Sequence, residues 1–167
     1  MAIDLKDIFI RTNLKSGDIG YIIYLHGYWY QKEYGYSMAF ETYVAKGFHE
    51  FYDQYDPSKD CVWICEHNGS LIGFLLLMHR QNHVAQLRYF IVLPGYRGIG
   101  LGKKLMQLYM NWLKEHDYHS SYLWTTNEQE TAGALYIKFG FELTEEHDST
   151  AFGKLLKEQR YDFILKT

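Results

Sequence analysis

A glycine-rich turn between residues 92 and 103 is the segment of this chain best suited to chemistry. It joins an apolar, aromatic stretch over 87–93 to an amphipathic helix expected over 101–115. Glycines at positions 98, 100 and 102 leave no side chains over the backbone N–H groups at the start of that helix. Those donors and the positive end of the helix dipole favour a bound phosphate. Because Arg97 and Lys103 add two cations, a pyrophosphate is the ligand expected here.

Two other phosphate-binding glycine loops fit this segment poorly. A P-loop ends in Gly-Lys-Ser/Thr after a four-residue gap, whereas Gly102 is followed by Lys103 and Lys104. The dinucleotide fingerprint needs glycines at its first, third and sixth positions within a βαβ unit. Here the sixth position is Lys103, and the sequence shows no such crossover. A strand-to-helix turn without any ligand is the other alternative.

Two segments carry a family resemblance. The pattern Arg-x-x-Gly-x-Gly from Arg97 to Gly102, preceded by Val-x-Pro, resembles the acyl-CoA-binding motif of the GNAT superfamily of N-acetyltransferases. Residues 134–141 resemble that family's Ala-Leu-Tyr-x-Lys-x-Gly-Phe segment, and both motifs lie in the expected order within residues 85–145. More faintly, residues 12–50 resemble acetyltransferase domains that are sometimes fused to MarR-type regulators.

The resemblance implies an acetyl-CoA-dependent N-acetyltransferase that transfers an acetyl group to a primary amine by direct attack in a ternary complex. It implies that Tyr136 protonates the departing thiolate as the catalytic residue. Backbone N–H groups before the glycine turn would hold the pantetheine and polarise the thioester carbonyl, and the turn itself would hold the pyrophosphate. The cofactor-binding residues implied are Phe90, Ile91, Val92, Arg97, Gly98, Ile99, Gly100, Leu101, Gly102, Lys103, Asn127 and Tyr136.

The general base is where the chain departs from the family pattern. Many relatives carry a glutamate where this chain has Gln86, or on the following strand, where residues 122–126 offer no carboxylate. Asn127 lies nine residues before Tyr136, farther than the family's asparagine usually lies. We therefore expect proton removal through a relayed water, or binding of an amine that is already neutral.

The first helices commonly cover the acceptor site in relatives, which makes His26, Glu33 and Glu41 the candidate substrate-binding residues. The alternative for each is a solvated helix charge or a buried, hydrogen-bonded histidine. Aromatic residues at 28–30, 34 and 36 either line an acceptor pocket or belong to the core. The missing base keeps a second function open, a non-catalytic sensor that binds acetyl-CoA or CoA. The acceptor itself, a small-molecule or peptide amine, is not specified by the sequence.

Composition limits the partners. A chain of 167 residues with a net charge of −3 has no basic stripe for nucleic acid, and no apolar run approaches the ~20 residues that span a bilayer. Its acidic, amphipathic start predicts no signal peptide and a cytoplasmic location. Cys61 and Cys65 are expected as reduced core thiols, and no metal site is expected, because the histidine pairs His79/His83 and His116/His119 lie at element ends. A homodimer is compatible with the family resemblance.

The expected fold class is α+β, a single GNAT-like domain over residues 1–167 with a mixed, mostly antiparallel central sheet flanked by helices. Asn68-Gly69 between two β-rich runs predicts a hairpin. Apolar periodicity and turn residues predict helices over 19–34, 39–55, 101–115 and 128–138, and strands over 8–13, 61–67, 71–78, 85–92, 118–125, 141–144 and 160–165.

Overall fold

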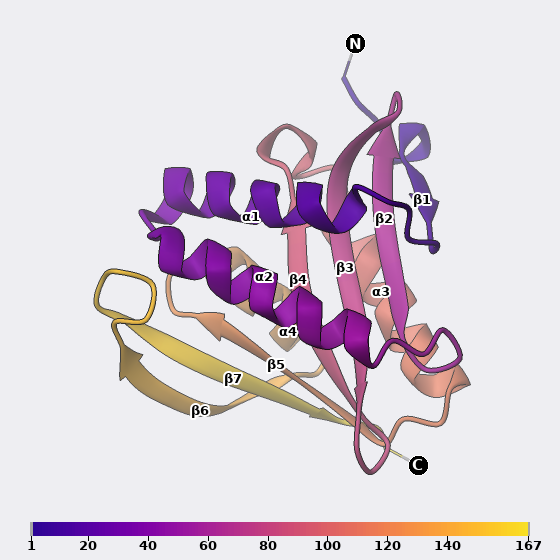
Figure 1. Cartoon of the computed structure of the whole chain (residues 1–167). Helices are drawn as coiled ribbons and strands as arrows, with labels where there is room; N and C mark the ends of the chain where they lie inside the picture. Colours follow the sequence, from indigo (N-terminus) through magenta and orange to yellow (C-terminus); the bar gives the residue numbers. More distant parts are fainter. Residues whose placement is uncertain (1, 167) are drawn as a thin grey trace. The chain divides into compact units, whose positions relative to one another are not determined.

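The computed structural model describes residues 2–166 (Figure 1). Its helices are α1 (Asp18–Tyr34), α2 (Met38–Asp53), α3 (Leu101–Glu115) and α4 (Glu130–Lys138). Its strands are β1 (Phe9–Arg11), β2 (Cys61–His67), β3 (Ser70–Arg80), β4 (Val84–Val92), β5 (Ser120–Thr126), β6 (Glu142–Ser149) and β7 (Leu156–Ile164). Every helix and strand expected from the sequence is present. The expected α+β class with a mostly antiparallel sheet is confirmed, and the strand order is β1-β2-β3-β4-β5-β7-β6.

The chain divides into two compact units. The first contains the chain up to Asn13, Pro57–Ser121 and the residues from Ile164 onward. The second contains Leu14–Asp56 and Tyr122–Phe163, so that β5 begins in the first unit and continues in the second. No helix in the described part of the chain is both long and apolar enough to cross a membrane.

In the first unit, β1 to β4 form an antiparallel sheet. The expected hairpin at Asn68-Gly69 is confirmed, because both residues adopt positive φ, 50° and 77°, between β2 and β3. Helix α3 packs on this sheet through Trp63 of β2, whose ring centroid lies 6.1 Å from that of Tyr109 and 6.3 Å from that of Trp112. These contacts hold α3 on the sheet and thereby position the N-terminus of the helix.

In the second unit, α1 and α2 pack against each other, with the rings of Tyr30 and Phe40 stacked 4.7 Å apart. Gly27 permits this close approach, because a Cβ added there would lie 2.3 Å from the Glu41 carboxylate of α2. A glycine at position 27 therefore allows the two helices to pack closely. Helix α4 packs on β7, where the ring centroids of Tyr136 and Tyr161 lie 6.0 Å apart.

Strands β6 and β7 are longer than the sequence predicts, and α2 ends two residues earlier than expected. Nearly all of β6 is exposed, and it carries the charged run from Glu145 to Asp148, so no hydrophobic alternation marks it. Its extent is set by pairing with β7, from Glu142 opposite Asp162 to Ser149 opposite Leu156. Such long-range pairing leaves no local signal in the sequence.

Candidate active site

The glycine-rich turn follows directly from β4 and is held to the first unit by two side chains. Residues Pro94–Tyr96 form a short 3-10 turn, which the sequence did not predict. The Tyr96 hydroxyl lies 3.0 Å from Nδ1 of His67, at the end of β2. The Arg97 side chain folds back, and its Nε donates to the Val92 carbonyl at 2.9 Å. The turn is therefore anchored at Tyr96 and Arg97, just before its glycines.

The backbone conformation at positions 98 and 100 favours glycine over other residues. The φ angles of Gly98 and Gly100 are 82° and 88°, in the left-handed region that costs other residues about 1–2 kcal/mol. A Cβ added at either position would meet no atom within 4 Å. The space over this part of the turn is open, so a ligand can approach the backbone directly.

Helix α3 begins at this turn with a free positive end. Gly100 is its N-cap and supplies no side-chain hydrogen bond, and the first intrahelical bond runs from Lys104 N to Gly100 O at 3.0 Å. The N–H groups of the preceding first turn have no acceptor within the helix. That turn contains no acidic residue and carries exposed Lys103 and Lys104. The arrangement provides hydrogen-bond donors and positive charge for an anion.

Strand β4 contains an irregularity just before the turn. Its pairing with β3 shifts between Phe74 and Leu76, which face Ile91 and Arg88, so β4 holds one extra residue there. Tyr89, in this bulge, has a φ of 58°. Beyond the bulge, Leu93 N donates to Ile72 O of β3 at 2.9 Å. Because N–H directions alternate along a strand, the N–H of Ile91 lies on the β3 side and that of Val92 points away from β3.

Tyr136 lies in α4 of the second unit and is buried. Its ring packs against Phe141 and Tyr161 with centroid distances of 6.2 and 6.0 Å. Burial raises the pKa of the Tyr136 phenol above its usual value of 10, and the nearby Tyr161 adds to this shift. The phenol therefore keeps its proton throughout the neutral range, as a proton donor must.

Asn127 is engaged in the backbone of the second unit. Its Oδ1 accepts from Lys157 N at 2.8 Å, and its own N donates to Lys157 O at 3.0 Å. These two bonds tie the end of β5 to β7. Cofactor binding by Asn127 stays a prediction, and any such contact would have to coexist with this structural role.

The three candidate acceptor residues lie in different environments. His26 is buried in α1, its Nδ1 donates to Ile22 O at 2.8 Å, and its ring stacks on Tyr30 at 5.4 Å. Glu41 lies over Gly27 of α1, next to His26 in sequence, whereas Glu33 is exposed near the end of α1. Glu41 therefore lies against the middle of α1, whereas Glu33 lies near the end of that helix, away from Glu41.

The burial of His26 predicts an acid-sensitive fold. Burial lowers its pKa from 6.5 to about 4, although the hydrogen bond to Ile22 opposes this shift. The unfolded chain then binds this proton between those two values while the folded chain does not, so stability falls as the pH falls from about 6.5 towards 4. From pH 7 to 4.5 the free energy of unfolding falls by about 2–3 kcal/mol from this group.

Urea unfolding of the His26→Phe variant is expected to lack this part of the pH dependence, while the His49→Gln variant, changed at an exposed histidine, keeps it. Equal pH slopes for His26→Phe and the parent would contradict the assignment.

Two polar groups that the sequence did not single out are buried on or after β5. Among the residues the structure describes, Thr125 Oγ1 and Glu128 Oε2 have no hydrogen-bond partner, while Glu128 Oε1 binds Lys154 at 2.6 Å. Such atoms in a native protein usually contact water or a ligand. By contrast, the buried Gln86 of β4 is satisfied, because its Oε1 accepts from Nε and Nη2 of Arg80 at 3.0 and 2.6 Å.

Comparison with known proteins assigns the chain to a family. The model of the acetyltransferase (GNAT) family matches residues 22–141, which include the glycine turn and Tyr136. The chain belongs to the GNAT family. An uncharacterized N-acetyltransferase of Escherichia coli K12 is 32% identical over 96 residues, which are 56% of this chain and 58% of that protein. N-acetyltransferase 8B of mouse is 25% identical over 101 residues, 58% of this chain and 44% of that protein.

Solved structures agree with the GNAT fold. A GNAT acetyltransferase from Staphylococcus aureus Mu50 superposes with a TM-score of 0.75 at 21% identity, covering 95% of this chain and 99% of that one. A putative streptothricin acetyltransferase from Bacillus anthracis, solved in complex with acetyl coenzyme A, gives a TM-score of 0.58 at 21% identity and covers 70% and 69%. This chain spans between 41% and 58% of the length of the curated relatives it matches. The narrower resemblance to MarR-fused domains stays a prediction.

Proposed function

We propose that this GNAT chain transfers an acetyl group from acetyl-CoA to a primary amine. The observation that carries the proposal is the start of α3, an uncapped helix end behind two left-handed glycines with open space over them. A pyrophosphate fits this site because it accepts several N–H bonds and its charge complements the helix dipole and the lysines. Family membership and the acetyl-CoA complex of the Bacillus anthracis protein support the same ligand.

Within this proposal, Gly98 to Lys103 bind the pyrophosphate through their backbone. The Arg97 guanidinium, already anchored to Val92 O through Nε, adds a positive charge beside it. The Val92 N–H, which points away from β3, is the donor of β4 that we assign to the pantetheine and the thioester. Ile91, with its N–H on the β3 side, contributes by fixing the strand.

Tyr136 acts in this proposal as the proton donor to the departing thiolate. A thiol of ordinary pKa, about 8.5, leaves more readily when a donor stabilises the developing negative charge. The Tyr136 phenol carries a proton at neutral pH and can donate it, while burial, which raises its pKa, makes it a weaker acid than a free phenol. Its buried ring, held between Phe141 and Tyr161, keeps the hydroxyl in one orientation.

Direct attack by the amine is preferred to an acyl-enzyme route. Both cysteines, Cys61 and Cys65, are buried and free, and burial raises the pKa of each thiol to about 12. An activated nucleophilic cysteine needs the opposite, a lowered pKa and access to substrate. The acetyl group therefore passes from sulfur to the amine nitrogen in one complex of both substrates, and the amine must lose a proton as the new bond forms.

An enzyme and a sensor of acetyl-CoA differ in one measurable respect. When the protein is incubated with acetyl-CoA and pooled primary amines, an N-acetyltransferase is expected to release free CoA thiol faster than spontaneous hydrolysis. The pools should contain small amines, amino acids and peptides with free α-amino groups. Tight binding of acetyl-CoA without thiol release across all pools would contradict the enzyme and favour the sensor.

A further inference from the structure

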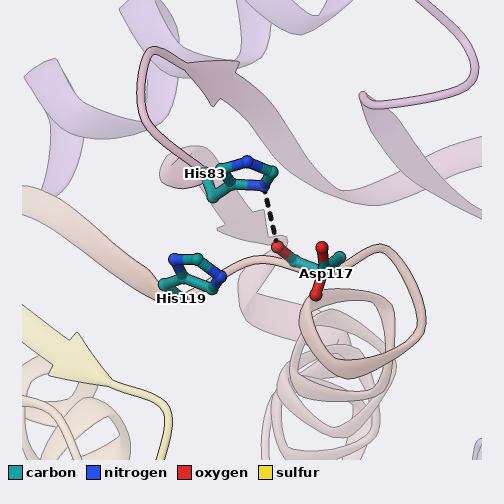
Figure 2. A group of neighbouring side chains, drawn as sticks. All are labelled: His83, Asp117 and His119. Carbon is teal, nitrogen blue, oxygen red and sulfur yellow. Dashed lines mark hydrogen bonds between the residues drawn. The ribbon is translucent and has the colours of Figure 1, made fainter.

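Three potential metal ligands meet at one end of the first unit. His83 ends the turn between β3 and β4, and Asp117 and His119 lie between α3 and β5 (Figure 2). One ligand atom from each side chain lies within 4.8 Å of those of the other two, and all three residues are exposed. The sequence groups His83 with His79 and His119 with His116, and only the fold reveals that His83 and His119 are neighbours.

The backbone holds these residues together independently of their side chains. His119 N donates to His83 O at 2.8 Å, and Leu165 N donates to His119 O at 2.9 Å. Asn82, His83 and Asp117 all have φ angles near 60°, a conformation that non-glycine residues rarely adopt. The two segments are thus fixed side by side in an unusual backbone geometry that presents the three side chains to solvent.

The two histidine rings face one another, and the His83 ring is held by the backbone carbonyl of Asp117. Nδ1 of His83 lies 3.1 Å from the Asp117 carbonyl and must donate to it, because a carbonyl only accepts; Figure 2 shows this contact. The rings of His83 and His119 stack with centroids 4.8 Å apart and planes inclined by 20°.

We propose that His83, Asp117 and His119 bind a divalent transition metal ion of the Zn²⁺ type. Two imidazoles and one carboxylate suit Zn²⁺, whereas Ca²⁺ and Mg²⁺ prefer oxygen ligands alone. Zn–N bonds of 2.0–2.1 Å place tetrahedral ligand atoms about 3.3 Å apart, so the side chains close in by rotation, which their exposure permits. Each imidazole binds the ion through one ring nitrogen and keeps its proton on the other, and water completes the coordination.

This site is separate from the glycine turn. His83 immediately precedes the nine residues of β4, and the turn follows them, so roughly 25–30 Å of strand lies between the two. The ion therefore does not reach a ligand at the turn. Its effect is to link the β3–β4 turn to the segment that enters β5, which stabilises the folded state increasingly as the free metal concentration rises above the Kd.

The test uses the full chain, stripped of metal with a chelator, and Zn²⁺ as the titrant. Calorimetry is expected to show saturable binding of one Zn²⁺ per chain, with a rise in the thermal unfolding midpoint that EDTA reverses. In histidine-selective NMR, the signals of His83 and His119 should move together on titration. No saturable binding up to about 100 µM Zn²⁺ would overturn the proposal.

Three variants locate the site without disturbing the turns. His83→Asn and Asp117→Asn keep a residue that tolerates positive φ, and His119→Ala removes the second imidazole. Each is expected to weaken Zn²⁺ binding at least about tenfold. The matched control is His49→Ala, at an exposed histidine that forms a pair with Asp53 in α2. Unchanged affinity in the three variants, or equal loss in the control, would place the metal elsewhere and overturn the assignment.

Discussion

Replacing Gly100 with valine is expected to lower the affinity for acetyl-CoA at least about a hundredfold. Gly100 adopts a φ of 88°, which valine resists, and its open face would receive two methyl groups where the phosphate is proposed to bind. Losing two hydrogen bonds to a charged group removes about 3 kcal/mol or more, which corresponds to this fold-change. Titration calorimetry with acetyl-CoA measures the effect.

Gly95→Val is the matched control for this change. Gly95 lies in the same turn, in the 3-10 segment Pro94–Tyr96, with no positive φ and with open space around its Cβ position. We expect its acetyl-CoA affinity to stay within a few-fold of the parent. Thermal unfolding of both variants separates loss of binding from loss of folding. A folded Gly100→Val protein with parental affinity would exclude the α3 terminus as the phosphate site.

Tyr136→Phe is expected to reduce kcat by roughly ten- to a thousandfold with little change in KM for acetyl-CoA. The substitution keeps the buried ring and removes the proton that the thiolate is proposed to receive, and acid catalysis typically contributes 10²–10⁴. Because the proton is needed only as charge develops on sulfur, the loss falls on kcat. Steady-state kinetics with any amine that the pooled screen identifies measures both constants.

Tyr161→Phe provides the comparison, because this residue lies against Tyr136 on β7 and has no proposed chemical role. The kcat of the Tyr161→Phe variant is expected to remain near that of the parent.

Since burial raises the Tyr136 pKa above 10, the parent's kcat should show no loss from Tyr136 ionisation up to that pH. A fully active Tyr136→Phe protein would mean that solvent protonates the thiolate and that Tyr136 only packs.

The glycine turn could be predicted from the sequence because its information is local. Alternate glycines at 98, 100 and 102, an apolar run before them and an amphipathic run after them specify a strand, a turn and a helix without reference to the rest of the chain. The structure adds the reason for two of these glycines, which is positive φ rather than crowding. The hairpin at Asn68-Gly69 was predictable for the same reason.

Features that depend on contacts between distant residues were not predictable. The β4 bulge, which shifts the register so that the N–H of Ile91 and not that of Val92 lies on the β3 side, is visible only in the pairing with β3. The structural role of Asn127 depends on Lys157, thirty residues later, and the histidine–aspartate cluster joins residues 83 and 119. No propensity or spacing rule encodes such pairings, because each is set by the packed fold.

Calorimetric titration of the parent protein with acetyl-CoA measures whether the chain binds this cofactor. We expect saturable binding of one acetyl-CoA per chain, weakened by rising salt because a charged phosphate site contributes. Desulfo-CoA should compete for the same site, because the pyrophosphate is the group that the α3 terminus is proposed to hold. Absence of measurable affinity for acetyl-CoA in the folded parent protein would contradict both the enzyme and the sensor.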